Sequence, residues 1–581
     1  MKKQPFGKST TKVGEINNLC KHEADTSETI HSLITKFDIN SKLKSFEDIK
    51  KKGFKVSELI IILLVMPFLR LRIDTMSKKE RGRGLSKAKK DAYYDLKNNQ
   101  QINWRGILSV LVKQFVKLSH AECPGGHTGA RALIGDDTTV CKSGLKIERT
   151  SRIHDHTTGS FLFGYKVLVL GWYDGKSFVP IDFSIHREKG TGSKKALKRC
   201  EKAEARLKAN RLIYKEKESK LKNIRKAGKQ LATHCKSDGK RYGKAFESNK
   251  KKSAKQALEL KKIKKAIENQ EQTYKDLVQA YKESKKKHQL YGLSESQRKG
   301  QFKKDRIKNS FGYKREKDVD SKKTDNLLKM IQRSSKLKIK ADYFIADSWF
   351  FSTKLITGVL QSKMGMHYLG MAPQRASIHY AYDGKMVDST YLMKAPQLKT
   401  HRCRRFRSSY RCVQVEYAGT QMQLYFIKMG NCKTWKLLAT TDLSLNFTKL
   451  FELYQIRWSI EVFFKESKQY LGFGKCQSRD FDAQICSITL SMVQHILLCY
   501  HKRIHCQQKL DGLFEDIGYQ TMEASIVDRM IAQFIELLDI VAQVMSVEPI
   551  ELYLKLIQNP KAVKILTELR LEAFMEGKKA A

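Results

Sequence analysis

The sequence predicts an α/β protein with helical regions at both ends and two insertions in its core. Three observations lead to this prediction. Two short apolar runs end in acidic residues, at 130–138 and 341–347, and two β-rich runs meet at Asp174-Gly175. Long stretches near both ends carry apolar residues at helical spacing. With 581 residues, of which 41% are hydrophobic, the chain is long enough for several domains with buried cores.

Residues 1–125 are predicted to form a helical N-terminal region that binds DNA. Residues 55–72 are strongly apolar, and 102–120 carry apolar residues at helical spacing. The longest apolar run, 59–69, is too short to span a bilayer, so it indicates a buried helix end rather than a membrane anchor. Because polar sequence follows the basic N-terminus where a signal peptide needs an apolar segment, we expect a cytoplasmic protein.

Residues 126–480 are predicted to form a catalytic core in which acidic residues follow strands. The first strand ends at Asp136 and Asp137, and a fourth strand, 341–346, ends at Asp347. Between them the sequence predicts a hairpin over 159–185 and a helix over 323–336. Three antiparallel strands, a helix and further strands, with acids at the ends of the first and fourth, is the order of a ribonuclease-H-like α/β fold.

Two insertions are predicted within this core. Residues 190–290 are rich in lysine and helix-favouring, and 201–300 contain 30 Lys and Arg against 12 Asp and Glu, a net charge of +18. Apolar residues are sparse and the heptads look irregular, so we expect a long antiparallel helical hairpin rather than a clean coiled coil. It is either a solvated spacer or a clamp for the DNA backbone. Residues 373–440 alternate in polarity and predict a β-rich insertion.

Residues 481–581 are predicted to be a helical C-terminal region. Apolar residues recur through 526–541 at helical spacing. This pattern is explained either by a dimer contact or by an ordinary helical core.

The charge of the chain points to an anionic partner. Lys and Arg number 112 against 60 Asp and Glu, a formal net charge of +52. Nucleic acid is the commonest partner for such a surplus. A membrane surface fits less well, because the basic residues spread along most of the chain instead of flanking an apolar segment.

The segment 447–471 is predicted to be a helix with a polar stripe. Tyr454, Arg457, Glu461, Lys465 and Lys468 lie at offsets that stack on one helical face. A glutamate flanked by cations fits a metal ligand among groups that hold phosphates. A salt-bridged surface stripe is the alternative, and such stripes are common on helices.

The spacing Tyr454-(2)-Arg457-(3)-Glu461-(6)-Lys468 resembles the signature of the bacterial insertion-sequence-four family of DDE transposases. IGDDTT at 134–139 and IADSWF at 345–350 resemble the two aspartate motifs of that family. The resemblance covers roughly half of the chain, 130–190 and 290–500. It implies that Asp137, Asp347 and Glu461 are the catalytic metal ligands. Asp136 remains the alternative to Asp137.

The same resemblance implies the cofactor and further site residues. Three carboxylates suit two Mg²⁺ ions, for which Mn²⁺ can substitute. Arg457, Lys465 and Lys468 are expected to bind DNA phosphates, with Tyr454 donating a hydrogen bond. Trp435 is either a platform for an extruded base at a hairpin intermediate or a packed core residue. Lys142 is either a DNA contact or ordinary surface charge.

The function expected from these features is a cut-and-paste DNA transposase. It would bind the terminal inverted repeats of its element, cleave there, and join the 3′-ends to target DNA. We expect a homodimer in a synaptic complex on double-stranded DNA, no membrane partner, and a place on the prokaryotic nucleoid. The alternative is a catalytically inactive, transposase-derived DNA-binding protein, and the presence of all three acids favours the enzyme. A ribonuclease-H-like nuclease for RNA–DNA hybrids would need neither the cation-bearing glutamate helix nor the β-rich insertion.

Overall fold

The computed structural model divides the chain into two compact units, each described here by itself. The first contains 1–149, 165–186 and 301–581, and the second contains 150–164 and 187–300. The structure describes residues 30–49, 53–76, 86–122, 129–155, 159–188, 192–237, 243–290, 297, 299–430, 432, 434–504 and separate positions between 537 and 564. The apolar positions 526–531 expected in a dimer contact lie outside the described residues, as does most of 505–581.

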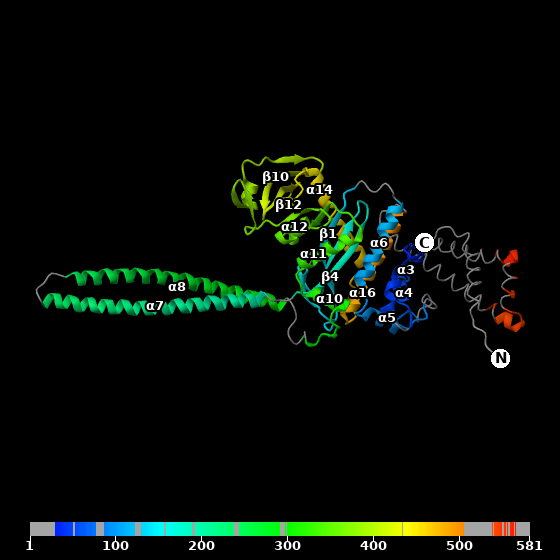
Figure 1. The fold of residues 1–581 in the computed structure, drawn as a ribbon, viewed down its shortest axis with the longest axis horizontal. Helices are drawn as coiled ribbons and strands as arrows, with labels where there is room; N and C mark the ends of the chain where they lie inside the picture. Colours follow the sequence, from blue (N-terminus) through cyan, green and yellow to red (C-terminus); the bar gives the residue numbers. More distant parts are fainter. Residues whose placement is uncertain are drawn as a thin grey trace. The chain divides into compact units, whose positions relative to one another are not determined.

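A helical region surrounds the long apolar helix α16 (Phe481–Ile504). The N-terminal helices α4 (Val56–Val65), α5 (Lys90–Asn98) and α6 (Trp104–Glu122) all pack on α16, and Figure 1 shows α6 beside it. Two short helices, α2 (Ile30–Lys36) and α3 (Ile39–Leu43), complete this layer. The N-terminal helices and the first C-terminal helix therefore share one core, although the sequence suggested separate regions.

Among the described residues, α16 is the one helix long and apolar enough to cross a membrane. In its most apolar window, 94% of the residues are buried inside the structure. Such burial is what the core helix of a folded domain shows, so length and composition are weak evidence for a membrane span here.

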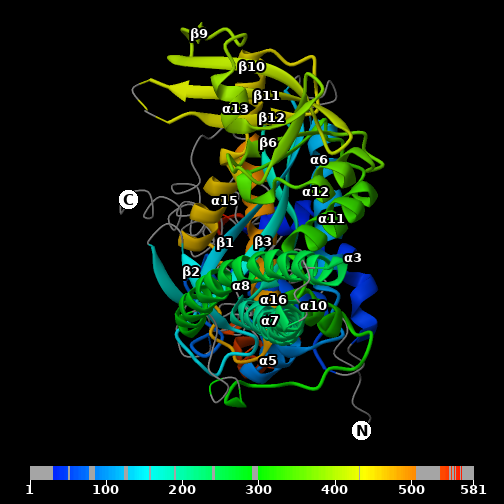
Figure 2. The same ribbon diagram turned by 90° about the vertical axis from the view of Figure 1, so that its left-hand side faces the viewer.

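The central sheet orders its first strands as β4-β3-β1-β5-β6. Strands β1 (Ala132–Cys141), β5 (Tyr343–Ala346) and β6 (His367–Ala372) are parallel, whereas β3 (Ser160–Tyr173) and β4 (Phe178–His186) form the expected antiparallel hairpin. At its turn, Asp174 Oδ1 accepts hydrogen bonds from the amides of Lys176 and Ser177. In Figure 2, α11 (Lys323–Ser334) and α12 (Thr353–Leu360) lie on one side of β1, and the glutamate-bearing helix lies on the other.

The strands between residues 379 and 440 extend the central sheet. Strand β12 (Lys436–Thr440) pairs antiparallel with β6, and β11 (Thr420–Met429) and β10 (Ser408–Tyr417) follow in order. The edge of the insertion consists of β7 (His379–Tyr382), β8 (Lys385–Asp388), helix α13 (Ser389–Lys394) and β9 (His401–Cys403). The result is a mixed α/β fold with one 12-stranded, mostly antiparallel sheet.

The segment predicted as a single helix over 447–471 is two helices. α14 (Phe447–Gln455) ends, Ile456 and Arg457 form a turn, and α15 (Trp458–Gln469) begins. The amide of Arg457 donates to the carbonyl of Tyr454, three residues back, which is the tighter 3₁₀ pattern. The polar stripe therefore does not run along one continuous helix, although Arg457 still starts the helix that carries Glu461.

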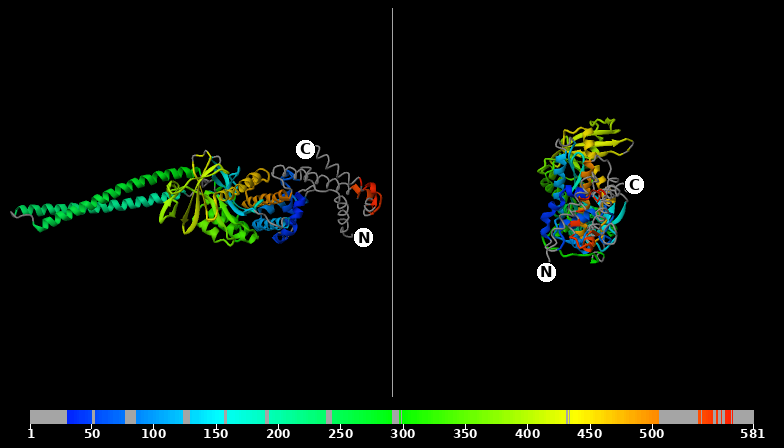
Figure 3. Two further views of the ribbon diagram at one scale, coloured as in Figure 1. Left: turned by 90° about the horizontal axis from the view of Figure 1, so that it is seen from above. Right: turned by 90° about the vertical axis from the view of Figure 1, so that its right-hand side faces the viewer.

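The second unit contains strand β2 (Ser151–Asp155), which pairs with the beginning of β3, and a hairpin of two long helices. Helices α7 (Gly192–Ser237) and α8 (Lys244–Leu290) run side by side in Figures 1 and 3. A set of their less exposed positions recurs every seven residues along the contact between the two helices. In α7 they are Cys200, Leu207, Tyr214, Leu221 and Gly228; in α8 they are Phe246, Ser253, Leu260, Ile267 and Tyr274.

The apolar repeat is interrupted, as the sequence suggests, because polar residues occupy part of the seam. There Asn210 Nδ2 donates to Gln270 Oε1 at 2.9 Å, and Lys217 pairs with Glu259 at 2.8 Å. An apolar pattern alone does not reveal a repeat whose partners bind through hydrogen bonds and charge.

A buried ion cluster joins the loop after β1 to the start of α16. The Arg306 side chain is fully buried, and both of its terminal nitrogens donate to Glu148 at 2.8 Å. Asp480 and Asp482 accept from the same guanidinium, and Lys304 pairs with both of these aspartates. Because three acids surround one arginine, its loss would leave buried charges without compensation.

We predict that Arg306→Leu lowers the free energy of unfolding by about 3–5 kcal/mol, because it breaks a buried charge network from one side. Urea unfolding followed by tryptophan fluorescence measures this. Lys354→Ala, which removes an exposed pair with Asp325, is the control and should cost less than about 1 kcal/mol. Equal effects of the two substitutions would contradict a structural role for the cluster.

Candidate active site

Two carboxylates lie side by side because β1 and β5 are parallel and in register. Gly135 pairs with Ala346, so the next residues, Asp136 and Asp347, lie next to each other at the same point of the sheet. Paired residues of neighbouring strands direct their side chains to the same face. The register thus selects Asp136, rather than Asp137, as the partner of Asp347.

Asp347 ends β5 and begins the short 3₁₀ helix η4 (Ser348–Phe350). Its Oδ1 accepts a hydrogen bond from the Trp349 amide at 2.9 Å. Burial raises the pKa of Asp347, opposed by this hydrogen bond and by Arg457. Capping the helix fixes the orientation of the carboxylate without using all of its oxygen lone pairs.

Arg457 links Asp136 to Glu461. Its guanidinium donates to Asp136 Oδ2 at 3.1 Å and to Glu461 Oε1. Burial, together with the nearby carboxylates Asp347 and Asp137, raises the pKa of Asp136 to about 7, against the opposing effects of the Asp137 amide and of Arg457. The three acids Asp136, Asp347 and Glu461 therefore gather around one cation, with too little positive charge to neutralise them all.

Asp137 has a different environment. Lys323 Nζ lies 2.6 Å from its Oδ2, and Lys166 Nζ lies 3.9 Å from its Oδ1. Two lysines already compensate the charge of this carboxylate. Asp137 therefore holds Lys323 and Lys166 beside the site. Asp137, the expected metal ligand, is thus paired with lysines, whereas its one-residue alternative, Asp136, is paired with Arg457.

The other residues predicted on the segment that carries Glu461 lie in three different environments. Lys468 Nζ donates to Thr138 Oγ1 of β1 at 2.7 Å, which brings it to the same strand as the aspartates. The Tyr454 ring lies under the Arg457 guanidinium at 5.8 Å, and burial raises the pKa of its hydroxyl to about 12. Lys465 is exposed on α15 and free to meet a ligand from solvent.

Lys142, for which a DNA contact was one interpretation, has other surroundings. Lys142 is only 6% exposed, and its Nζ donates to the carbonyls of Gly474 and Cys476 at 2.6 Å each. Burial lowers its pKa to about 8. Lys142 therefore ties β1 to the loop after α15, which differs from the expected DNA contact.

Trp435 is half-buried against the core of the β-rich insertion, and the Arg411 guanidinium lies 5.8 Å from its ring centre. Its carbonyl accepts from Gln374 Nε2 at 2.8 Å. Both interpretations of Trp435 remain open in this position.

The structure adds residues that sequence reasoning missed. Lys323, the first residue of α11, lies 4.7 Å above the ring of Trp349 while it pairs with Asp137. Trp349 is 55% exposed directly beside Asp347. The helix start and the IADSWF motif marked both places in the sequence, but only the fold brings them together.

The carboxylates fit a divalent cation in kind, although they are not assembled around one. Among the described residues, no three Asp, Glu, His or Cys side chains stand ready to hold a metal ion. Arg457 accounts for this, because it fills the position between Asp136 and Glu461. A donor set of carboxylate oxygens suits Mg²⁺ or Mn²⁺.

Comparison with known proteins gives one family match. Residues 312–497 match the family model described as a transposase DDE domain. This match supports a transposase. It includes Asp347, Arg457 and Glu461, while Asp136 precedes it.

A search of curated proteins finds no match. Among solved structures, the chain is similar to a piggyBac transposase in a synaptic complex with hairpin DNA, with a TM-score of 0.36 and 10% identity over 87% of this chain and 82% of that one. The family match is therefore the comparison that bears on function.

We predict that, without divalent ions, the contribution of Asp136 to the free energy of unfolding falls as the pH rises from about 4 to about 7. The pKa of Asp136 is about 7 in the folded protein against 3.8 for the free side chain, so the unfolded chain releases this proton first. Asp136→Asn should remove about 1–3 kcal/mol of this fall. Urea unfolding at pH 5 to 8 measures this difference between the unsubstituted protein and Asp136→Asn. Identical pH dependence of the two proteins would contradict a raised pKa of Asp136 among crowded carboxylates.

Proposed function

We propose that this chain is a cut-and-paste DNA transposase whose catalytic carboxylates are Asp136, Asp347 and Glu461. The observation that supports this most directly is the adjacency of Asp136 and Asp347 on parallel strands, with Glu461 joined to Asp136 through Arg457. A folded protein keeps crowded, partly buried acids at a cost to its stability, and such groups cluster at functional sites.

The chemistry needs these residue types. Two divalent cations, when bound by the three carboxylates, activate a water or a 3′-hydroxyl and stabilise the leaving oxygen of a phosphodiester. Arg457 would leave the carboxylates and bind a phosphate beside the scissile bond, since its planar fork matches two phosphate oxygens. Lys465 and Lys468 would add point charges, and the protonated Tyr454 hydroxyl can donate a hydrogen bond.

The sheet order β4-β3-β1-β5-β6 supports a ribonuclease-H-like core within this proposal. Asp347 then lies just after the end of β5, where α/β folds present catalytic groups, and Asp136 lies beside it within β1. The four-residue signature around Glu461 supports membership of the insertion-sequence-four family, whose members act as dimers on paired transposon ends. We further propose that the enzyme acts on double-stranded DNA of transposon ends and target, on the nucleoid of a prokaryotic cell.

A second candidate is a transposase-derived protein that binds DNA without cleaving it. The net charge of +52 fits both. The retained acids and the raised pKa of Asp136 favour the enzyme, because a DNA-binding remnant has no use for crowded carboxylates.

We predict that Asp136→Ala, Asp347→Ala and Glu461→Ala each lower Mg²⁺-dependent cleavage of a duplex carrying the element's end by about a thousandfold or more. Each removes a ligand to ions that supply several kcal/mol of transition-state stabilisation. Asp137→Asn is the matched comparison, and it should retain more activity than Asp136→Asn. Full cleavage by Asp347→Ala would refute the triad, and the opposite order of the two neighbours would restore Asp137 as the ligand. Chelation by EDTA should abolish cleavage by the intact protein.

We predict that excision passes through a hairpin at the transposon end and that Trp435→Ala slows hairpin formation more than first-strand nicking. Extruding a base costs stacking that an aromatic platform offsets. Gel analysis of nicked and hairpin products measures both steps, with Trp435→Phe as the control that keeps an aromatic ring. Equal loss of both steps would mean that Trp435 only packs in the insertion.

A further inference from the structure

The helical hairpin has two halves of different charge. We define the hairpin tip as residues 219–237 of α7 and 244–258 of α8. The tip contains 11 Lys and Arg against a single acid, Glu247, whereas the rest of the two helices contains 19 against 9. All 11 cations of the tip are exposed.

The other half carries more acids, and several of its cations are paired with them. Arg211 pairs with Glu271 across the hairpin at 2.6 Å, and Lys208 pairs with Glu204 one turn away at 2.8 Å. The last such pair before the tip is Lys217 with Glu259. Beyond it, the described sequence supplies one acid for eleven cations, so neighbouring like charges repel one another.

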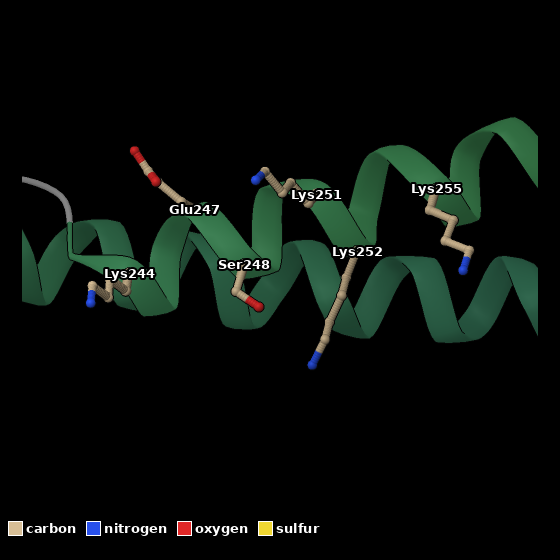
Figure 4. A pocket seen from close by; sticks show the side chains of 6 residues that line it. All are labelled: Lys244, Glu247, Ser248, Lys251, Lys252 and Lys255. Atoms are coloured by element: carbon tan, nitrogen blue, oxygen red, sulfur yellow. The ribbon is translucent and has the colours of Figure 1, made fainter.

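The tip cations are arranged in stripes. On α8, the spacing of Lys244, Ser248, Lys251 and Lys255 places them on one helical face. Figure 4 shows the shallow hollow on this helix, with Glu247 pointing away from Lys252; it is lined by Lys244, Glu247, Ser248, Lys251, Lys252 and Lys255. On α7, Lys222, Arg225 and Lys229 repeat at a similar spacing. Two positions in each seven form the contact between α7 and α8. These cations lie at other positions, so they are not needed to hold the helices together.

We propose that the hairpin tip is a second DNA-binding surface, which binds the phosphate backbone of a duplex without reading its sequence. Over the roughly 25 Å that the tip helices span at 1.5 Å per residue, duplex DNA presents about 15 phosphates. A rigid rod with a dense, exposed and uncompensated positive surface matches that density. The proposal rests on the proposed function only in taking DNA as the partner. Phosphate binding at the tip does not require the carboxylates.

The test uses the full chain carrying Asp347→Ala, without metal ions, and a fluorescent 30-base-pair duplex that lacks any transposon end. Affinity is measured between 50 and 200 mM salt. We expect Lys251→Gln, Lys252→Gln and Lys255→Gln together to reduce the slope of log affinity against log salt by about 2–3, since each phosphate contact contributes about 0.9. Glutamine preserves helix propensity, and circular dichroism checks that the helices remain.

The matched control replaces three exposed lysines of the compensated half, Lys202, Lys275 and Lys282, by glutamine, and its slope should change by less than about 1. An unchanged slope in the tip variant, or an equal change in both variants, would overturn the proposal. Tip-dependent binding to phosphatidylserine vesicles with tip-independent binding to the duplex would also overturn it. Because cleavage is absent in this background, failure of the catalytic proposal would show only in the separate cleavage assay.

Discussion

The parallel pairing of β1 with β5 is the constraint on which the rest of the site depends. It fixes Asp136 and Asp347 next to each other, and two carboxylates so placed repel unless a cation lies between or beside them. Arg457 supplies that charge in the protein alone, and in doing so it also fixes Glu461. The turn before α15 matters for the same reason, because it brings Arg457 to the start of the helix that carries the third acid.

The surrounding cations fall into two groups with different tasks. Lys323 and Lys166 compensate Asp137, and Lys142 is bound to buried carbonyls, so these three maintain the geometry of β1. Arg457 pairs with carboxylates from which a bound metal ion would displace it, and Lys465 faces solvent. A site that binds an anionic polymer needs both groups of cations. The lysines around β1 keep the strand in place while Arg457 and Lys465 exchange their partners.

Much of this architecture could be predicted from sequence. The hairpin turn at Asp174, the helix over 323–336 and the place of Asp347 directly after a strand follow from local patterns, and all appear in the fold. The expected strand end at Asp136 is wrong, because β1 continues to Cys141. The choice between Asp136 and Asp137 could not be made, because it depends on a register with a strand some 210 residues away in the chain. The burial of Lys142 has the same origin, since its carbonyl partners lie more than 300 residues later.

The helical hairpin shows a different limit of sequence reasoning. Its seven-residue repeat was obscured because Asn210, Lys217 and Gln270 hold seam positions through polar bonds. Once the seam is known, the charges outside it become informative, because packing does not select them. In the compensated half they follow the pairing that stabilises an exposed helix, whereas at the tip they work against it. A surface that opposes the stability of its own helices and still leaves every cation exposed has the electrostatics of a binding surface, because an anionic polymer removes the repulsion that water and salt only screen.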